Sequence, residues 1–150
     1  MTHYRETTLD ELWSNADLLT HLWDHLTDGK EDSDMRYLLR RDPSLPMFSK
    51  VVILATQGET VVGWAALYAA GRRRGYADVF VHPDQRQQGI GTKLVKDLKA
   101  AFLRDGLCRL CVGDVPVFRA TLGEPTRVDS EHDHLVWYEG STLASPRVVQ

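Results

Sequence analysis

The stretch VFVHPDQRQQGIGTKLV, from Val79 to Val95, joins an apolar, strand-like run to a polar turn with two glycines and then to a helical pattern. From Ile90 onward, apolar residues recur at the spacing of one helical face, at Leu94, Val95, Leu98, Ala101 and Phe102. The stretch therefore predicts a strand, a glycine-containing loop and an amphipathic helix in direct succession.

The start of the predicted helix is suited to binding an anion. Free N–H groups at a helix N-terminus and the helix dipole attract negative charge, and the glycines let a ligand approach the backbone closely. The stretch is not a Walker loop. That motif needs the pattern G-x-x-x-x-G-K-[ST], whereas here Lys93 follows Thr92. It is not a dinucleotide fingerprint either, because Leu94 stands where the third glycine is needed. The loop therefore predicts either a phosphate site of another kind or a glycine-containing helix start that binds no ligand.

The hydrophobic pattern predicts the other elements of a mixed α/β domain. A short strand at 1–8 is followed by one bent helix or two short ones, with Thr8 as N-cap and Gly29 as the stop. The further expected elements are a helical turn at 35–39, a hairpin of 50–56 and 60–70, a basic turn at 71–75, strands at 76–81 and 107–112, a short helix at 115–123, a weak strand at 126–130 and a last strand at 134–140. The strands at 76–81 and 107–112 flank a helix, so we expect them to be parallel.

Composition limits the class of protein. The chain has 150 residues, 43% of them hydrophobic, and a formal net charge of -3. This suits one domain over residues 1–150, and nucleic acid is not expected as a partner because general polyanion-binding proteins are basic. No apolar run approaches a membrane span, and MTHYRETTLD lacks a signal-peptide core. We expect a cytoplasmic protein without a membrane partner, and a homodimer is compatible with the sequence.

The cysteines and histidines do not predict a redox or metal site. Cys108 and Cys111 lie in a strand-like run, where residues three apart face opposite sides, so we expect one to be buried and the other more exposed. A redox pair would need a helix N-terminus, and a metal site would need two further ligands. His21 and His25 are four residues apart, but no third ligand is evident. No metal is expected.

The opening stretch resembles the acetyl-CoA signature of the GNAT superfamily of N-acetyltransferases. Its motif, [QR]-x-x-G-x-[GA], is met by the residues from Arg86 to Gly91, after a strand ending in Val-x-Pro and before an amphipathic helix. The resemblance implies a mixed α+β, GNAT-like fold, with a central mixed sheet of six to seven strands flanked by about four helices. It also implies an acyltransferase that uses acetyl-CoA as cosubstrate.

The resemblance assigns cofactor-binding residues. Arg86 would shape or neutralise the loop, and the backbone of Val79, Phe80 and Val81 would align the pantetheine and the acetyl carbonyl. Phe118, in the run FRATLG, is counted with the cofactor site. Backbone N–H groups would hold the CoA pyrophosphate at Gln87, Gln88, Gly89, Ile90, Gly91 and Thr92.

The resemblance also suggests catalytic residues, with departures from the family pattern. Asp78 would be the general base or hold a cationic amine, although a solvated strand carboxylate is an equal interpretation. Arg119 stands where many relatives have a tyrosine acid, and an arginine cannot donate a proton at neutral pH. The usual asparagine is missing as well. Tyr138 or His134 could replace the acid, or both are ordinary strand residues.

Two functions follow from these observations. The first is an N-acetyltransferase that moves the acetyl group to a primary amine of a small molecule or peptide, by direct attack in a ternary complex. The second is a catalytically impaired GNAT-fold module that binds CoA or a partner protein without transfer. Acidic residues near Trp13 and Trp23 would suit a cationic amine, unless they are only the solvated face of the helices.

Overall fold

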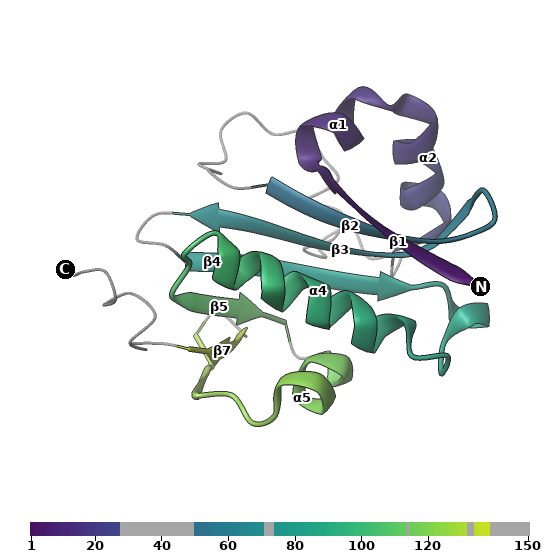
Figure 1. Cartoon of the computed structure of the whole chain (residues 1–150). Coiled ribbons are helices and arrows are strands. Elements are labelled where there is room, and N and C mark those ends of the chain that lie inside the picture. The colour runs from purple at the N-terminus through teal and green to yellow at the C-terminus, as the bar shows by residue number, and fades with distance from the viewer. Residues whose placement is uncertain (28–49, 71–73, 114, 132–133, 139–150) are drawn as a thin grey trace.

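The computed structural model describes residues 1–27, 50–70, 74–113, 115–131 and 134–138 (Figure 1). The predicted helical turn at 35–39, the stop at Gly29 and part of the basic turn at 71–75 lie outside these residues. The elements, in chain order, are β1 (Thr2–Thr8), α1 (Leu9–Ser14), α2 (Ala16–His25), β2 (Lys50–Gln57), β3 (Thr60–Ala70), β4 (Arg74–Val81), the 3-10 helix η1 (Pro83–Gln85), α4 (Ile90–Arg104), β5 (Arg109–Val112), α5 (Pro116–Leu122), β6 (Arg127–Asp129) and β7 (His134–Trp137).

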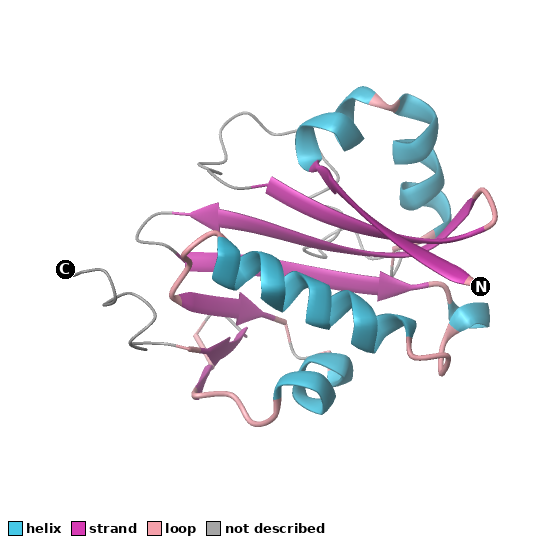
Figure 2. Ribbon diagram, viewed as in Figure 1, coloured by secondary structure: helices cyan, strands magenta, loops and turns pink. Residues whose placement is uncertain are grey.

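The strands form one mixed sheet of seven, in the order β1-β2-β3-β4-β5-β7-β6. Neighbours are antiparallel except β4 and β5, which are parallel and joined through α4. This confirms the mixed α/β fold and the predicted crossover. The described helices flank the sheet on both sides, with α4 running along the strands and α1 and α2 lying together opposite it (Figure 2).

Two apolar clusters, one on each face of the sheet, form the core. On β4, Ala77 and Val79 point towards α4 and α5, while Phe80 points towards α1 and α2. This alternation follows from the strand period of two. The apolar stripe of α4 is buried against the sheet, as the sequence predicted. The polar N-terminal end of that helix is therefore held next to the end of β4.

The N-terminal helical region consists of two short helices. The side chain of Thr8 accepts a hydrogen bond from the backbone N–H of Glu11 at 3.1 Å, which confirms the predicted N-cap. Asn15 interrupts the helix in an extended conformation and caps α2, its side chain accepting from the N–H of Leu18 at 3.1 Å. The Glu11 carboxylate accepts from the hydroxyl of Thr7. The asparagine thus decides between one bent helix and two.

Trp64 ties α2 to the sheet, and its replacement tests this packing. The side chain is fully buried, and its Nε1–H donates to the backbone oxygen of Leu26 at 2.8 Å. We expect Trp64→Phe to lower the free energy of unfolding by about 1–3 kcal/mol, because a buried carbonyl loses its donor. Trp137→Phe is the matched control, since the Nε1 of buried Trp137 has no partner among the described residues. Urea denaturation should show a clearly smaller decrease in the free energy of unfolding for Trp137→Phe than for Trp64→Phe. Equal decreases would contradict the role of the Trp64 hydrogen bond.

Candidate active site

β4 and β5 separate before β4 ends. Their pairing runs from Arg74 opposite Arg109 to Ala77 opposite Val112, whereas β4 continues to Val81. Beyond Ala77, β4 remains paired with β3 on its other edge. The edge that faces away from β3 thus presents backbone groups to a gap in the sheet, and such groups are available to a peptide-like ligand.

A cavity of about 540 Å³ lies at this gap. Three segments line it, and they come from the end of β4, from the loop with the start of α4, and from the connection between β5 and α5. The lining residues are Val79, Phe80, Val81, Gln85, Arg86, Gln87, Gly89, Ile90, Gly91, Thr92, Val115, Pro116 and Val117. The structure thus brings the opening stretch of the sequence together with a segment that begins at Val115.

The start of α4 presents unused donors to the cavity. Its first backbone hydrogen bond runs from the N–H of Lys93 to the oxygen of Gly89, at 3.1 Å. The N–H groups of Ile90, Gly91 and Thr92 precede that bond, and Gly89 has no side chain that could cap them. Together with the helix dipole, these donors make the cavity wall favourable for an anion.

The loop adopts a strained conformation next to these donors. Gly89 has φ 79°, and Gln87 has φ 66°, which is unusual for a residue with a side chain. A non-glycine residue in the left-handed backbone conformation costs free energy, and such residues occur preferentially at ligand-binding sites. The surrounding contacts therefore have to maintain the shape of this loop.

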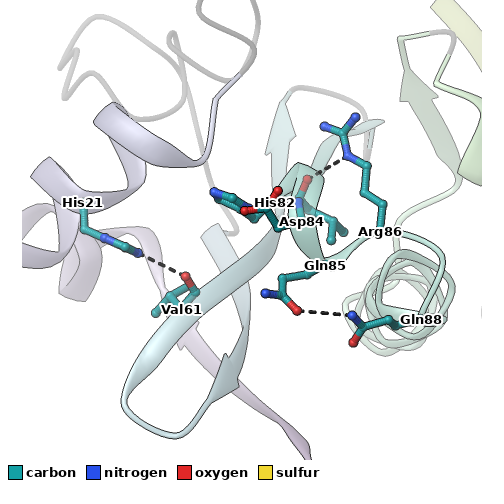
Figure 3. Close-up of polar contacts among 8 residues, drawn as sticks. His21, Val61, His82, Asp84, Gln85, Arg86 and Gln88 are labelled. Atoms are coloured by element: carbon teal, nitrogen blue, oxygen red, sulfur yellow. Dashed lines mark hydrogen bonds and ion pairs between the residues drawn. The ribbon is translucent and has the colours of Figure 1, made fainter.

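Polar contacts anchor the loop to the sheet (Figure 3). The Nε–H of Arg86 donates to the oxygen of Val81 at 3.0 Å, and its guanidinium lies 5.3 Å from the centre of the Phe80 ring. The side-chain amide of Gln88 donates to the side-chain oxygen of Gln85 at 3.2 Å (Figure 3). Arg86 thus links the loop directly to the end of β4.

Gly91 keeps one wall of the cavity open. A Cβ at this position would lie 3.2 Å from Cγ2 of Val117 and 3.7 Å from Cγ2 of Val81. The first distance is tighter than an ordinary contact, so a side chain would press on Val117 or fill the cavity. The glycine that matches the last position of the motif therefore leaves space that a side chain would take from Val117 or from the cavity.

Most predicted cofactor residues line the cavity, with two exceptions. Gln88 is not among the lining residues, and its side-chain oxygen accepts from the amide of Gln57 at 3.3 Å. Phe118 is fully buried in the core, its ring 6.4 Å from that of Trp137. Sequence reasoning missed Gln85 and the segment Val115–Val117, because no local pattern indicates which distant segment closes a gap in a sheet.

Of the predicted catalytic residues, Asp78 directly precedes a residue that lines the cavity. It is half-buried, directly follows the last paired residue of β4, and precedes the lining residue Val79. Its register partner on β3 is Ala66, which belongs to the apolar cluster under α1 and α2. Asp78 therefore points to the face opposite α4.

Neither Arg119 nor Tyr138 is among the residues that line the cavity. The guanidinium of Arg119 donates to the carboxylate of Glu124 at 2.9 Å. The prediction that Tyr138 belongs to the last strand is wrong, because β7 ends at Trp137 and Tyr138 turns to φ 64°. Its ring lies 5.3 Å from Phe102, near the far end of α4 and about 16 Å along that helix from Gly91.

The described residues do not form a metal or thiol site. Cys111 is buried and Cys108 is half-buried, as predicted, and burial raises the pKa of the Cys111 thiol. His21 bonds through Nε2 to the oxygen of Val61 at 3.0 Å, which ties α2 to β3 (Figure 3). Within residues 1–27, 50–70, 74–113, 115–131 and 134–138, no group of three candidate metal ligands occurs. None of the helices in those ranges is long and apolar enough to span a membrane.

The acidic residues of the N-terminal helices are solvated. Asp10, Glu11, Asp17 and Asp24 are all exposed, while Trp13 and Trp23 pack against the apolar cluster of that face. The remaining acids of the predicted acceptor mouth, in residues 28–34, lie outside the described residues. The two helices therefore use their aromatic residues for packing.

The profile of the "Acetyltransferase (GNAT) family" matches residues 15–119. The chain belongs to the GNAT family. It is 37% identical over 93 residues to mycothiol acetyltransferase from Parafrankia sp. (strain EAN1pec), an alignment that covers 62% of this chain. The chain matches only 28% of the length of that relative.

Solved GNAT structures have the same fold. A protein from Exiguobacterium sp. 255-15 assigned as an acetyltransferase has a TM-score of 0.63 at 18% identity, with 91% of both chains covered. The structure of yncA from Salmonella typhimurium, solved with its cofactor acetyl-CoA, has a TM-score of 0.54 at 17% identity and covers 90% of both chains. At these identities the likeness establishes the fold.

Proposed function

We propose that this GNAT protein is an acetyl-CoA-dependent N-acetyltransferase that acts on a primary amine by direct attack in a ternary complex. The observation that carries the proposal is the cavity between the separated ends of β4 and β5, with the uncapped N–H groups of α4 in its wall. The similarity to a mycothiol acetyltransferase and to a structure solved with acetyl-CoA supports the same cofactor.

The cavity contains groups that match the chemistry of this cofactor. The N–H groups from Ile90 to Thr92 would bind the pyrophosphate, and the β4 backbone from Val79 to Val81 would bind the pantetheine amides. The apolar side chains of Val115 and Val117 would cover the arm from the opposite wall. Bound acetyl-CoA would supply the acetyl group and leave as the thiol of CoA.

Asp78 is proposed to act on the amine. It follows the last paired residue of β4 and points to the face opposite α4, so an amine approaching from that face would meet its carboxylate. Asp78 would hold the ammonium form and accept the proton that the nitrogen loses, directly or through water. Arg119 is not included, because an arginine cannot donate a proton at neutral pH. Tyr138 is not included, because it lies against Phe102 beyond the end of β7.

A CoA-binding module without transfer is the second candidate function. It is favoured by one observation, that Arg119 occupies the position of the usual tyrosine and is bound to Glu124. No tyrosine, histidine or cysteine lines the described cavity, so a proton donor for the departing thiolate is not evident there. The two candidates share the cofactor site and differ in turnover.

Calorimetry with acetyl-CoA, followed by a thiol-release assay over a panel of primary amines, tests the proposed function. We expect micromolar binding and amine-dependent release of CoA thiol, because the cofactor wall and Asp78 are both in place. The Asp78→Asn variant serves as the control, because it lacks the carboxylate that would accept the proton from the amine. Its thiol release shows how much transfer occurs without that carboxylate. Binding without turnover on any amine would favour the module, and lack of binding at micromolar concentration would contradict both candidates.

A further inference from the structure

Gly63, on β3, lies between two walls of the candidate cofactor cavity. It is aligned with Val81 of β4, and a Cβ added to it would lie 3.0 Å from the backbone oxygen of Phe80. On the side of α4, the same Cβ would lie 3.4 Å from Cδ1 of Leu94 and 3.5 Å from Cγ2 of Ile90. Phe80, Val81 and Ile90 all line the cavity. The space left by this glycine therefore borders both the end of β4 and the start of α4.

β3 is irregular directly before Gly63. Ala55 of β2 is aligned with Gly63, but the next residue, Thr56, is aligned with Val61, so the register skips Val62. Val62 belongs to the apolar cluster on the side of α4, and a Cβ on Gly63 would point to that side as well. Two consecutive residues on one face are typical of a β-bulge, and a glycine beside it permits close approach of a neighbouring backbone. The bulge and the glycine thus occur together where α4 begins to pack on the sheet (Figure 1).

The backbone conformation of Gly63 does not require a glycine. Its φ lies outside the left-handed region, unlike the φ of Gly89 at 79°, so an alanine can adopt it. What an alanine lacks here is space, because 3.0 Å from a Cβ to a backbone oxygen is shorter than an ordinary contact. That oxygen belongs to a strand paired with β3 and cannot move by itself. An alanine would therefore push β4 and the start of α4 away from β3.

The two walls would bind different parts of the proposed cofactor. The N–H groups at the start of α4 face the pyrophosphate, and the backbone at the end of β4 faces the pantetheine amides. Both parts belong to one molecule, so they bind together only if the spacing of the walls matches the spacing of these groups. When two linked groups cannot reach their sites simultaneously, the gain in affinity from linking them is lost.

We propose that Gly63 is a positioning residue of the cofactor site, which sets the spacing between the end of β4 and the start of α4 and thereby the fit of acetyl-CoA. This inference rests on the proposed acetyltransferase function. Gly63 does not line the cavity and acts through Phe80 and Ile90, which do. Its role differs from that of Gly91, whose missing side chain faces Val117 across the cavity.

Gly63→Ala tests the proposal, and Gly75→Ala is the matched control. A Cβ on Gly75 would be equally crowded, at 3.0 Å from Leu107, 3.1 Å from Leu67 and 3.2 Å from Phe102, none of which lines the cavity. Both variants overpack the side of the sheet that α4 covers, so both should lower the melting temperature. In calorimetric titrations we expect Gly63→Ala to bind acetyl-CoA at least about fivefold more weakly than wild type, and Gly75→Ala to stay within about twofold.

Fragments of the cofactor distinguish a change in spacing from damage to one wall. ADP carries the diphosphate and S-acetylpantetheine carries the arm, so each fragment uses one wall. We expect Gly63→Ala to bind each fragment within about twofold of the wild-type affinity, although it binds acetyl-CoA more weakly. A loss for either fragment as large as the loss for acetyl-CoA would contradict the spacing role.

A second pair of variants tests the same contact by removing atoms, and it decides the question if Gly63→Ala does not fold. Leu94→Val withdraws the Cδ1 nearest to Gly63, and Leu98→Val makes the same change one turn further along α4. Both leucines are fully buried, and neither lines the cavity. We expect acetyl-CoA binding to weaken at least about threefold for Leu94→Val and to stay within about twofold for Leu98→Val.

Equal acetyl-CoA affinities within the glycine pair would overturn the proposal, as would equal affinities within the leucine pair when Gly63→Ala does not fold. Failure of the proposed function is separate, because it appears as lack of acetyl-CoA binding in the wild-type protein.

Discussion

Replacing Gly91 with valine is expected to weaken acetyl-CoA binding at least about 100-fold, which corresponds to about 2.7 kcal/mol. The Cβ alone would lie 3.2 Å from Val117, and the two methyl groups of valine would extend into the cavity or displace α5. Either change closes the wall in which the N–H groups of α4 are presented. Calorimetric titration of wild-type protein and variant with acetyl-CoA measures the effect.

Two further variants make this result specific. Gly91→Ala adds only the Cβ, and we expect an intermediate loss of roughly fivefold to tenfold, since Val117 has to move by a few tenths of an ångström. Ala100→Val introduces the same β-branched side chain on the exposed face of α4 and should leave the affinity unchanged. If Gly91→Val binds acetyl-CoA as the wild type does, the cavity is not the cofactor site.

Replacing Asp78 with asparagine is expected to lower kcat/KM for the amine by about 100-fold or more, because a general base typically contributes 10²–10⁴. The dissociation constant of acetyl-CoA should stay within about twofold of wild type, since Asp78 does not line the cavity and points to the other face of the sheet. A lower rate of acetyl transfer with an unchanged dissociation constant of acetyl-CoA would indicate that Asp78 acts in the chemical step and not in cofactor binding.

The pH dependence of transfer completes this test. Without the carboxylate, the variant should recover part of its rate as pH rises, because more of the amine is then already deprotonated in solution. Asp17→Asn removes an exposed carboxylate from the first turn of α2 and should behave as wild type. A rate for Asp78→Asn equal to that of the wild type over the whole pH range would exclude Asp78 from the mechanism.

Much of the fold was predictable because its determinants are local. The spacing of apolar residues from Ile90 to Phe102 predicts α4 and the face it buries, and the structure has both. The N-cap at Thr8 and the parallel pairing of β4 with β5 were predictable for the same reason, since capping and crossover rules depend on short segments. The apolar spacing over residues 9–25 allows one helix or two, and the capping contact of Asn15 decides for two.

The site was predictable only in part. Local motifs identify the loop from Arg86 to Thr92, because its backbone conformation depends on its own glycines. They do not indicate that Phe118 is buried against Trp137, or that Tyr138 lies against Phe102 beyond the end of β7. Those positions depend on how distant strands align, and a shift of one residue moves a side chain to the other face.

The sequence by itself therefore determined the family, the crossover and the glycine-containing start of α4, since each of these follows from neighbouring residues. Only the tertiary structure decided that β4 and β5 separate after Ala77 and Val112, that Val115–Val117 closes the cavity, and that Arg74 lies directly opposite Arg109. The physical reason is that strand pairing is a contact between distant segments. Its register is set by the packing of two apolar clusters on opposite faces of one sheet.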